Sequence, residues 1–312
     1  MWNIKLELAA LVAAGSLLAS SPALIAEGHQ QGEGQAVVTI LPGQEIPGGI
    51  SQDALHVKID GKDSSVTGWK QLRSPAEIVV LIDDGARSSL GTQLSGIAKF
   101  IGQLPPATKV AVAYMQNGRA VFSTPLTADH AAAAHAVHLP MAGSGGISAS
   151  PYFCLSDLAK HWPSTDAQAR REVVMITDGV DNYEPRYDPN DPYVQAAIDD
   201  AVRARLIVYS IYWRAQGGFD NTAYAADSGQ SLLAELTVAT GGNSYWQGNG
   251  DPVNIEPYLA DIVRRLDSQY ELDFMTPAGA KPQMQSLKLK IGVHAKVDAP
   301  QQVYVHPGAE IE

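Results

Sequence analysis

The chain has 312 residues, of which 45% are hydrophobic and 18% charged, a balance that excludes an intrinsically disordered protein. Its formal net charge of −11 excludes a general nucleic-acid binder, because phosphate backbones are bound by basic surfaces. The one cysteine, Cys154, excludes an internal disulfide and lies in an apolar stretch, so we expect a buried thiol in a fold that its core stabilises.

Residues 1–26 have the pattern of a secretory signal peptide. Lys5 precedes an apolar stretch over residues 8–19, and small residues follow at 20–23. The apolar stretch is short for a helix that crosses a bilayer, which is what the alternative interpretation, a retained anchor, would need. We therefore expect cleavage of this leader, a periplasmic or secreted mature protein, and no stable membrane insertion afterwards.

Residues 27–73 predict a β-rich N-terminal segment. A polar, glycine-rich stretch over residues 27–35 is typical of a flexible leader. Strands are expected at 37–41 and 55–59, and the second alternates apolar and polar residues, as a strand with one solvated face does.

From residue 78 the pattern changes to alternating strands and helices. Apolar runs predict the strands, and apolar residues at helical spacing predict the helices between them. Asn117-Gly118 between two strands predicts a hairpin. In chain order the expected elements are a strand at 78–82, a helix at 90–101, hairpin strands at 110–114 and 120–122, a helix at 128–137, a helix ending near 161, a strand at 173–177, a helix at 194–202, a strand at 206–213 and a helix at 232–239.

This order predicts an α/β fold, with a doubly wound, mostly parallel sheet in a domain over residues 74–250. Residues 251–312 predict a final helix, to about Leu266, and then strands. These strands are expected at 270–274, 287–293 and 303–305. We expect them to pair with the N-terminal strands and to form a small β-rich appendage.

Two apolar strands in this order end on carboxylates. The first runs into Asp83 and Asp84, and the second runs into Asp178, with Asp181 shortly after it. In an open α/β sheet, ligands bind at the carboxyl ends of the strands, where neighbouring strands deliver their side chains to one edge. The two strand ends therefore predict a binding site.

The segments around these carboxylates resemble the von Willebrand factor A-type (VWFA) domain and its metal-ion-dependent adhesion site (MIDAS). The likeness covers residues 78–246 and includes the turn at Asp83, the Gly143-Ser-Gly-Gly146 loop and Thr177-Asp178-Gly179. The flanking segments Asp60-Gly61-Lys62 and Tyr270-Glu-Leu272 resemble the secreted VWFA-related branch common in acidobacteria. The resemblance implies a Rossmann-like sheet in an exported bacterial module that binds another protein.

The resemblance also implies a metal site, but this chain departs from its pattern. The family holds Mg²⁺ with an Asp-x-Ser-x-Ser turn, a threonine after a Gly-Gly loop, and the aspartate of Thr-Asp-Gly. Asp83 and Asp178 match the two aspartates, whereas Gly85, Arg87 and Ile147 replace the three hydroxyl ligands. Because Mg²⁺ sites tolerate ligand loss poorly, the prediction is a degenerate, metal-independent site without a cofactor.

Alternatives stay open at this site. Anchoring the turn on Asp84 restores one hydroxyl, Ser88, and Ser144 or Ser148 could approach from the glycine-rich loop, which would leave a remodelled site for Mg²⁺, Mn²⁺ or Ca²⁺. Our preferred hypothesis is that Arg87 replaces the metal, because a guanidinium can bridge carboxylates that would otherwise repel one another. The opposing interpretation places the Arg87 side chain in solvent on the turn.

We expect a protein-binding module rather than an enzyme, because no segment supplies a nucleophile, a base and an orienting group together. The polar loop over residues 181–193 is suited to recognition, since loops on rigid scaffolds often carry it. The alternatives are cation-dependent adhesion, a metal-assisted hydrolase that uses the clustered aspartates, and a structural envelope protein. The expected binding residues are Asp83, Asp84, Arg87, Asp178 and Asp181.

Overall fold

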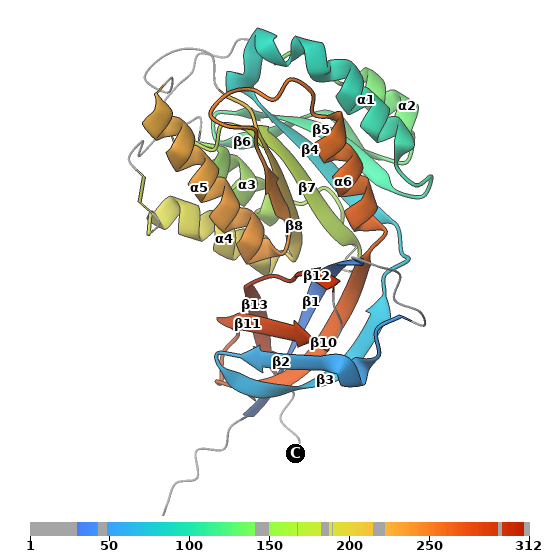
Figure 1. Ribbon diagram of the computed structural model, residues 1–312, viewed down its shortest axis with the longest axis vertical. Coiled ribbons are helices and arrows are strands. Elements are labelled where there is room, and N and C mark those ends of the chain that lie inside the picture. The colour runs from blue at the N-terminus through green and yellow to red at the C-terminus, as the bar shows by residue number, and fades with distance from the viewer. Residues whose placement is uncertain are drawn as a thin grey trace, which may run out of the picture.

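The computed structural model describes residues 30–42, 49–140, 150–166, 168–181, 187–188, 190–214, 222–292 and 295–308. The leader predicted over residues 1–26 lies outside these ranges. Within them the strands form two sheets, of six and seven strands. Figure 1 shows the six-stranded sheet between two groups of helices, with the strands of the other sheet gathered at one end of it. No helix in these ranges is both long enough and apolar enough to cross a membrane.

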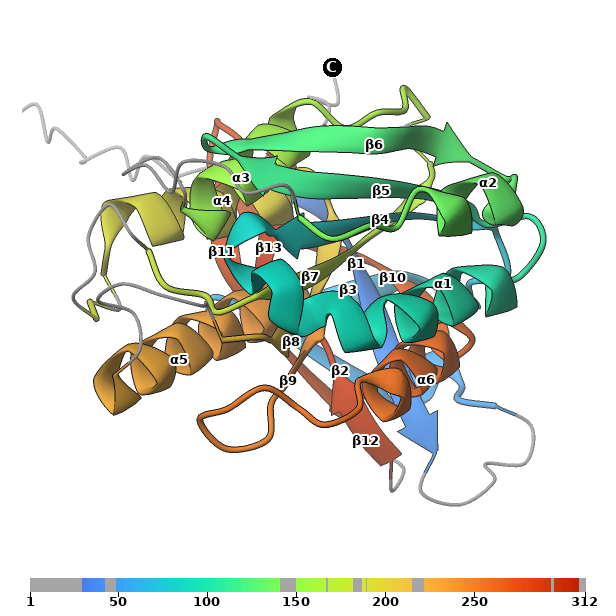
Figure 2. The same cartoon turned by 90° about the horizontal axis from the view of Figure 1, so that it is seen from above.

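The six-stranded sheet is built on continuous apolar runs. Its order is β6-β5-β4-β7-β8-β9; β6 is antiparallel to β5, and all other neighbours are parallel. Figure 2 shows β6, β5 and β4 side by side. The central strands are buried along almost their whole length, as strands covered on both faces are. The strands span Ala76–Asp83 (β4), Lys109–Gln116 (β5), Arg119–Thr127 (β6), Arg170–Thr177 (β7), Leu206–Tyr212 (β8) and Asn243–Tyr245 (β9).

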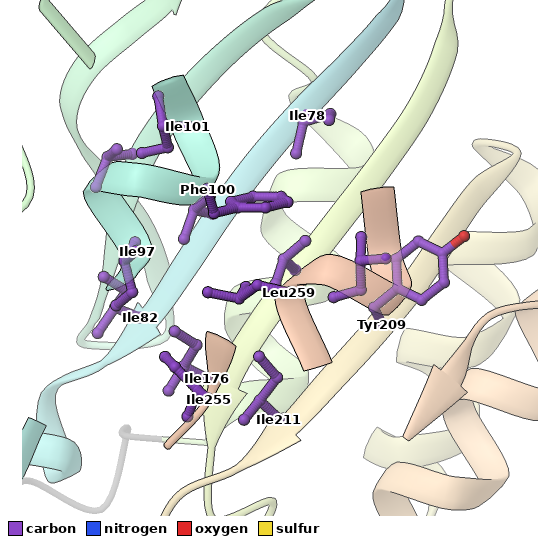
Figure 3. Packing of buried hydrophobic residues seen from close by; sticks show 14 of the residues in the cluster. Ile78, Ile82, Ile97, Phe100, Ile101, Ile176, Tyr209, Ile211, Ile255 and Leu259 are labelled. Carbon is purple, nitrogen blue, oxygen red and sulfur yellow. The ribbon is translucent and has the colours of Figure 1, made fainter. Parts of the chain in front are cut away.

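Helices cover both faces of this sheet. Ile78 and Ile82 of β4 pack with Phe100 of α1 in one cluster (Figure 3), whereas Val79 and Leu81 belong to the cluster on the opposite face. This division follows from the strand itself, because successive side chains point to opposite faces. α1, α2 and α6 contribute to the first cluster, and α3, α4 and α5 to the second. The helices span Leu94–Gln103 (α1), His130–His135 (α2), Pro151–Lys160 (α3), Pro192–Arg203 (α4), Ala223–Thr240 (α5) and Glu256–Leu266 (α6).

The seven-stranded sheet is antiparallel and closed. Its order is β10-β3-β2-β11-β13-β1-β12, and an additional pairing of β10 with β1 closes six of these strands into a barrel. β12 pairs with the far end of β1. Short 3₁₀ helices precede β2 and follow β4. The elements span Gln30–Pro42 (β1), Gln52–Ala54 (η1), Leu55–Ile59 (β2), Lys62–Gln71 (β3), Asp84–Gln93 (η2), Gln269–Ala278 (β10), Gln283–Ile291 (β11), Ala295–Asp298 (β12) and Gln302–Pro307 (β13).

The fold class expected from the sequence is wrong. The sequence predicts an α/β fold with a doubly wound, mostly parallel sheet and a small β-rich appendage. The structure instead has a closed antiparallel barrel as its larger sheet, and the other sheet is mixed. The domain boundaries that accompany the prediction stay predictions.

Part of this error arises at the glycine-rich stretch over residues 27–35, which predicts a flexible leader. From residue 30 onward this stretch belongs to β1. A Cβ placed on Gly34 would lie 2.4 Å from Cζ of Phe274 on β10, so only glycine leaves room there for the aromatic ring. Glycine in a strand often marks such a close approach, and the composition alone does not distinguish it from flexibility.

A buried ion-pair network fixes α6 to the barrel. Arg265 is 1% exposed. Its Nε donates to Asp261 Oδ2 at 2.7 Å within α6, and its Nη1 donates to Asp298 Oδ2 at 2.6 Å at the end of β12. A buried guanidinium is tolerated only when it is paired in this way. The contact therefore ties a helix of the mixed sheet to the barrel.

Candidate functional site

The parallel pairing of β4 with β7 places Asp83, the first of the predicted carboxylates, beside Thr177. Ile82 lies opposite Ile176, so the next residues, Asp83 and Thr177, end their strands side by side. Thr177 Oγ1 donates to Asp83 Oδ2 at 2.5 Å, and the Gly85 N–H donates to Asp83 Oδ1 at 2.8 Å. Both oxygens of the Asp83 carboxylate are therefore held by donors of the protein itself.

Asp178 and Asp181 lie deeper, in the turn that follows β7, and are 5% and 2% exposed. Asp178 Oδ1 accepts the Val180 N–H at 2.9 Å. The hydroxyl of Tyr152 donates to the Gly179 carbonyl at 2.8 Å. Burial raises the pKa of Tyr152, and the charges of Asp178 and Asp181 raise it further, so both carboxylates lie near this ring. The structure thus gathers them around one buried tyrosine.

Helix α5 packs directly on this turn. A Cβ placed on Gly229 would lie 1.9 Å from the Asp178 carbonyl oxygen, which is a backbone atom that cannot rotate away. The helix can approach the turn only because residue 229 is glycine. This close contact fixes the position of the Asp178 turn at the end of the sheet.

The structure describes only some of the remaining predicted site residues. Asp84 begins η2 and is partly buried, whereas the sequence predicts a helix only from residue 90. Arg87 lies within η2, but its side chain is outside what the structure describes, so its bridging role stays a prediction. Ile147, Ser144 and Ser148 also lie outside the described residues.

The edge also contains residues that the sequence motifs did not indicate. Nε1 of Trp213, the residue directly after β8, donates to Ser89 Oγ at 2.8 Å. The Arg214 N–H donates to Asp251 Oδ1 at 2.7 Å, and burial raises the pKa of Asp251. Trp213 is the last residue of the apolar run that predicts a strand at 206–213, and it is 2% exposed. No local signal marks Asp251, because its contact depends on how the loop before α6 folds back.

The described residues do not fit a Mg²⁺ site. Gly85 offers no side-chain ligand atom, and both oxygens of Asp83 already accept hydrogen bonds from the protein. Asp178 Oδ1 likewise accepts a backbone N–H. An octahedral cation needs several oxygen ligands aimed at one point. In the part of the chain that the structure describes, no group of three or more His, Cys, Asp or Glu side chains is arranged to hold an ion.

The thiol of Cys154 is not placed for nucleophilic chemistry. The residue is fully buried in α3, as its apolar context predicts. Burial, followed by the nearby charges of Asp83 and Asp157, raises its pKa far above the usual range. Because the thiolate is the reactive form, this thiol is inert at neutral pH.

Three tyrosines are exposed beside the buried carboxylates. Tyr193 and Tyr224 lie in the first turns of α4 and α5, which begin at the carboxyl edge of the sheet. Tyr187 precedes α4, and its N–H donates to the Tyr224 hydroxyl at 3.1 Å. The three residues are 41% (Tyr187), 37% (Tyr193) and 59% (Tyr224) exposed. Tyr193 rests edge-on against Phe153 of α3, with 5.0 Å between ring centroids, so this tyrosine is supported by the helix beneath it.

No protein-family model and no curated protein matches this chain. Similar solved structures include an aerotolerance-related membrane protein from Bacteroides fragilis, at 14% identity and a TM-score of 0.43, which covers 62% of this chain and 98% of that chain. The conserved hypothetical protein BatB from Bacteroides thetaiotaomicron gives 14% identity, a TM-score of 0.43, and coverage of 61% and 97%.

A further similar structure is proximal thread matrix protein 1 from the mussel byssus, which is described with a zinc-occupied MIDAS motif. It gives 14% identity and a TM-score of 0.42, with 65% of this chain and 47% of that chain covered. Similarity at this level of identity and TM-score does not establish a ligand or an activity for this chain. The resemblance to the VWFA domain, and to its secreted branch, therefore stays a prediction.

Proposed function

We propose that this protein binds a protein partner through the carboxyl edge of its mixed sheet, that the contact needs no metal ion, and that it operates after export of the chain. The observation that carries the proposal is the group of exposed tyrosines, Tyr187, Tyr193 and Tyr224, beside the buried aspartates. Tyrosine is enriched in protein interfaces because it supplies a large, rigid contact area with a polar tip. The leader pattern supports the export.

The state of the carboxylates supports binding without metal. Asp83 is held by Thr177 and by a backbone N–H, and Asp178 accepts a backbone N–H of its own turn. These bonds keep the edge in one shape before any partner arrives. A preformed surface loses less conformational freedom on binding, which favours affinity.

Site-specific crosslinking tests the proposal. The photoreactive residue p-benzoylphenylalanine replaces Tyr193 or Tyr224 in the exported chain, and Phe122 on the edge strand β6, 36% exposed, serves as the matched control position. We expect one discrete crosslinked partner from the first two positions, with equal yield in EDTA and in Mg²⁺, and none from the control. Yield that disappears in EDTA would support the cation-dependent alternative. Equal crosslinking from all three positions would contradict a specific edge site.

A further inference from the structure

A cavity of about 270 Å³ lies at the opposite end of the sheet, where the amino ends of β7 and β8 meet the barrel. Its walls come from the end of α4, the start of β8, and strands β1, β10 and β13, which can be followed in Figure 1. This volume is close to the lower end of the range for small-molecule pockets. None of the three exposed tyrosines of the carboxyl edge lines this cavity.

The inner wall of the cavity is apolar. Leu206 and Ile207 of β8 and Val303 of β13 are each almost completely buried there. Ala36 of β1 adds a small side chain on the barrel side. Hydrocarbon placed against this wall leaves water at a gain of roughly 25 cal/mol for each Å² of surface.

The rest of the lining is rich in positive charge, although the whole chain carries a net charge of −11. Arg170, Arg203 and Arg205 all line the cavity, and Glu271 is the one carboxylate among the lining residues. Glu271 already pairs with Lys70 at 2.5 Å. An acidic protein therefore gathers cationic groups around an apolar hollow.

Contacts with the protein hold two of these arginines in place at the cavity. Nη1 of Arg170 donates to the Leu266 carbonyl at 2.6 Å and to the side-chain oxygen of Gln269 at 2.5 Å, and its charge also acts on the buried Glu172. The guanidinium of Arg203 lies 5.3 Å from the ring centroid of Tyr304, which holds it over the cavity wall, while it also pairs with Asp200 at 3.0 Å.

Arg205 is held in a backbone conformation that costs free energy. Its φ is +56°, in the left-handed region, at the position after the end of α4 where glycine is usual. Its side chain donates to Gln35 of the barrel. Such a conformation persists only where the surrounding contacts impose it, and the hydrogen bond to Gln35 is one of these contacts.

We propose that this cavity binds a small organic carboxylate with a hydrocarbon body. The hydrocarbon would lie against the apolar wall, and the carboxylate would lie at the mouth, between the exposed guanidinium groups of Arg203 and Arg205. Arginine suits this task because its fork of N–H donors matches a carboxylate.

Isothermal titration calorimetry of the full mature chain with octanoate tests the proposal. Octanol, which keeps the hydrocarbon, and inorganic phosphate, which keeps the negative charge, are the comparison probes. We expect saturable binding of octanoate at one site, and binding of the other two weaker by about tenfold or more, because octanol lacks the charged group and phosphate lacks the hydrocarbon. Equal affinity for octanol, or for phosphate, would overturn the proposal.

Two variants locate the site. Arg203→Gln combined with Arg205→Gln should weaken octanoate binding by about tenfold or more. Glu271→Gln, which removes the carboxylate from the lining, should tighten it severalfold. Arg264→Gln, on the exposed face of α6, is the matched control and should change nothing. If the double variant has a clearly lower melting temperature than the native chain, the Glu271→Gln variant provides the test instead. Unchanged octanoate affinity in Glu271→Gln, or in a double variant that remains stable, would refute the assignment.

Discussion

Replacing Glu172 by glutamine should change how the stability of the fold depends on pH. Glu172 lies at the amino end of β7 and is completely buried. Its Oε1 accepts from Gln269 Nε2 of β10 at 2.9 Å. Burial raises its pKa to about 7, although the charge of Arg170 and the hydrogen bonds of Gln269 and Tyr209 oppose this shift.

The size and sign of the effect follow from that pKa. The folded state holds its proton up to about pH 7, whereas the unfolded chain releases it near the ordinary pKa of 4.5. Between these values the folded state binds more protons, so the stability contributed by Glu172 falls as pH rises and then stays constant above about pH 7. At about 1.4 kcal/mol for each pH unit, the interval from 4.5 to about 7 corresponds to a loss of about 3 kcal/mol.

Urea unfolding of the native chain and of Glu172→Gln, measured from pH 4.5 to pH 8, isolates this contribution, because all other titrations cancel in the difference. We expect the native chain to lose about 3 kcal/mol relative to the variant across the range. Glu77→Gln serves as the control. It removes another buried carboxylate, on β4, but one that is paired with Lys109 and Trp162. Stability curves of Glu172→Gln and native protein that run parallel would refute the reasoning.

Further substitutions test the packing around both ends of the sheet. Gly229→Ala should destabilise the fold by about 1–3 kcal/mol in urea unfolding, because its Cβ meets a backbone oxygen; Gly102→Ala, in α1 with nothing near the new Cβ, should instead be neutral or stabilising. Thr177→Val should cost about 1–3 kcal/mol, because it removes the hydroxyl that holds a strand-end carboxylate; a serine there should retain most of the stability. Arg265→Met should lower the free energy of unfolding by about 3–5 kcal/mol, because two carboxylates lose a buried partner. Arg264→Met on the exposed face should cost less than about 1 kcal/mol.

The positions of Asp83 and Asp178 could be predicted because they depend on local sequence. A continuous apolar run predicts a buried strand, and the residue after it must lie at the end of that strand. What holds each carboxylate could not be predicted in the same way. The Thr177–Asp83 bond needs the register of two strands that are 94 positions apart. Asp251 comes to the edge through a loop without any pattern.

The barrel was harder to predict because its closure is entirely non-local. β1 pairs with β10, β12 and β13, and every one of these partners lies near the other end of the chain. Its first residues are polar and rich in glycine, so neither propensity nor periodicity marks them as a strand. The space that Gly34 provides is visible only once Phe274 is opposite it.

The barrel also determines which end of the mixed sheet can meet a partner. β10 begins three residues after α6 ends, and its first residue, Gln269, contacts both Arg170 and Glu172 at the amino end of β7. The amino edge is therefore covered by the chain itself, and Glu172 is kept from water by that cover. Because burial is what raises the pKa of Glu172, this cover contributes to the loss of stability that Glu172 causes as pH rises. The carboxyl edge is the opposite end of the same strands, and exposed tyrosines lie in the first turns of the helices there, which is why we propose a protein partner at that edge.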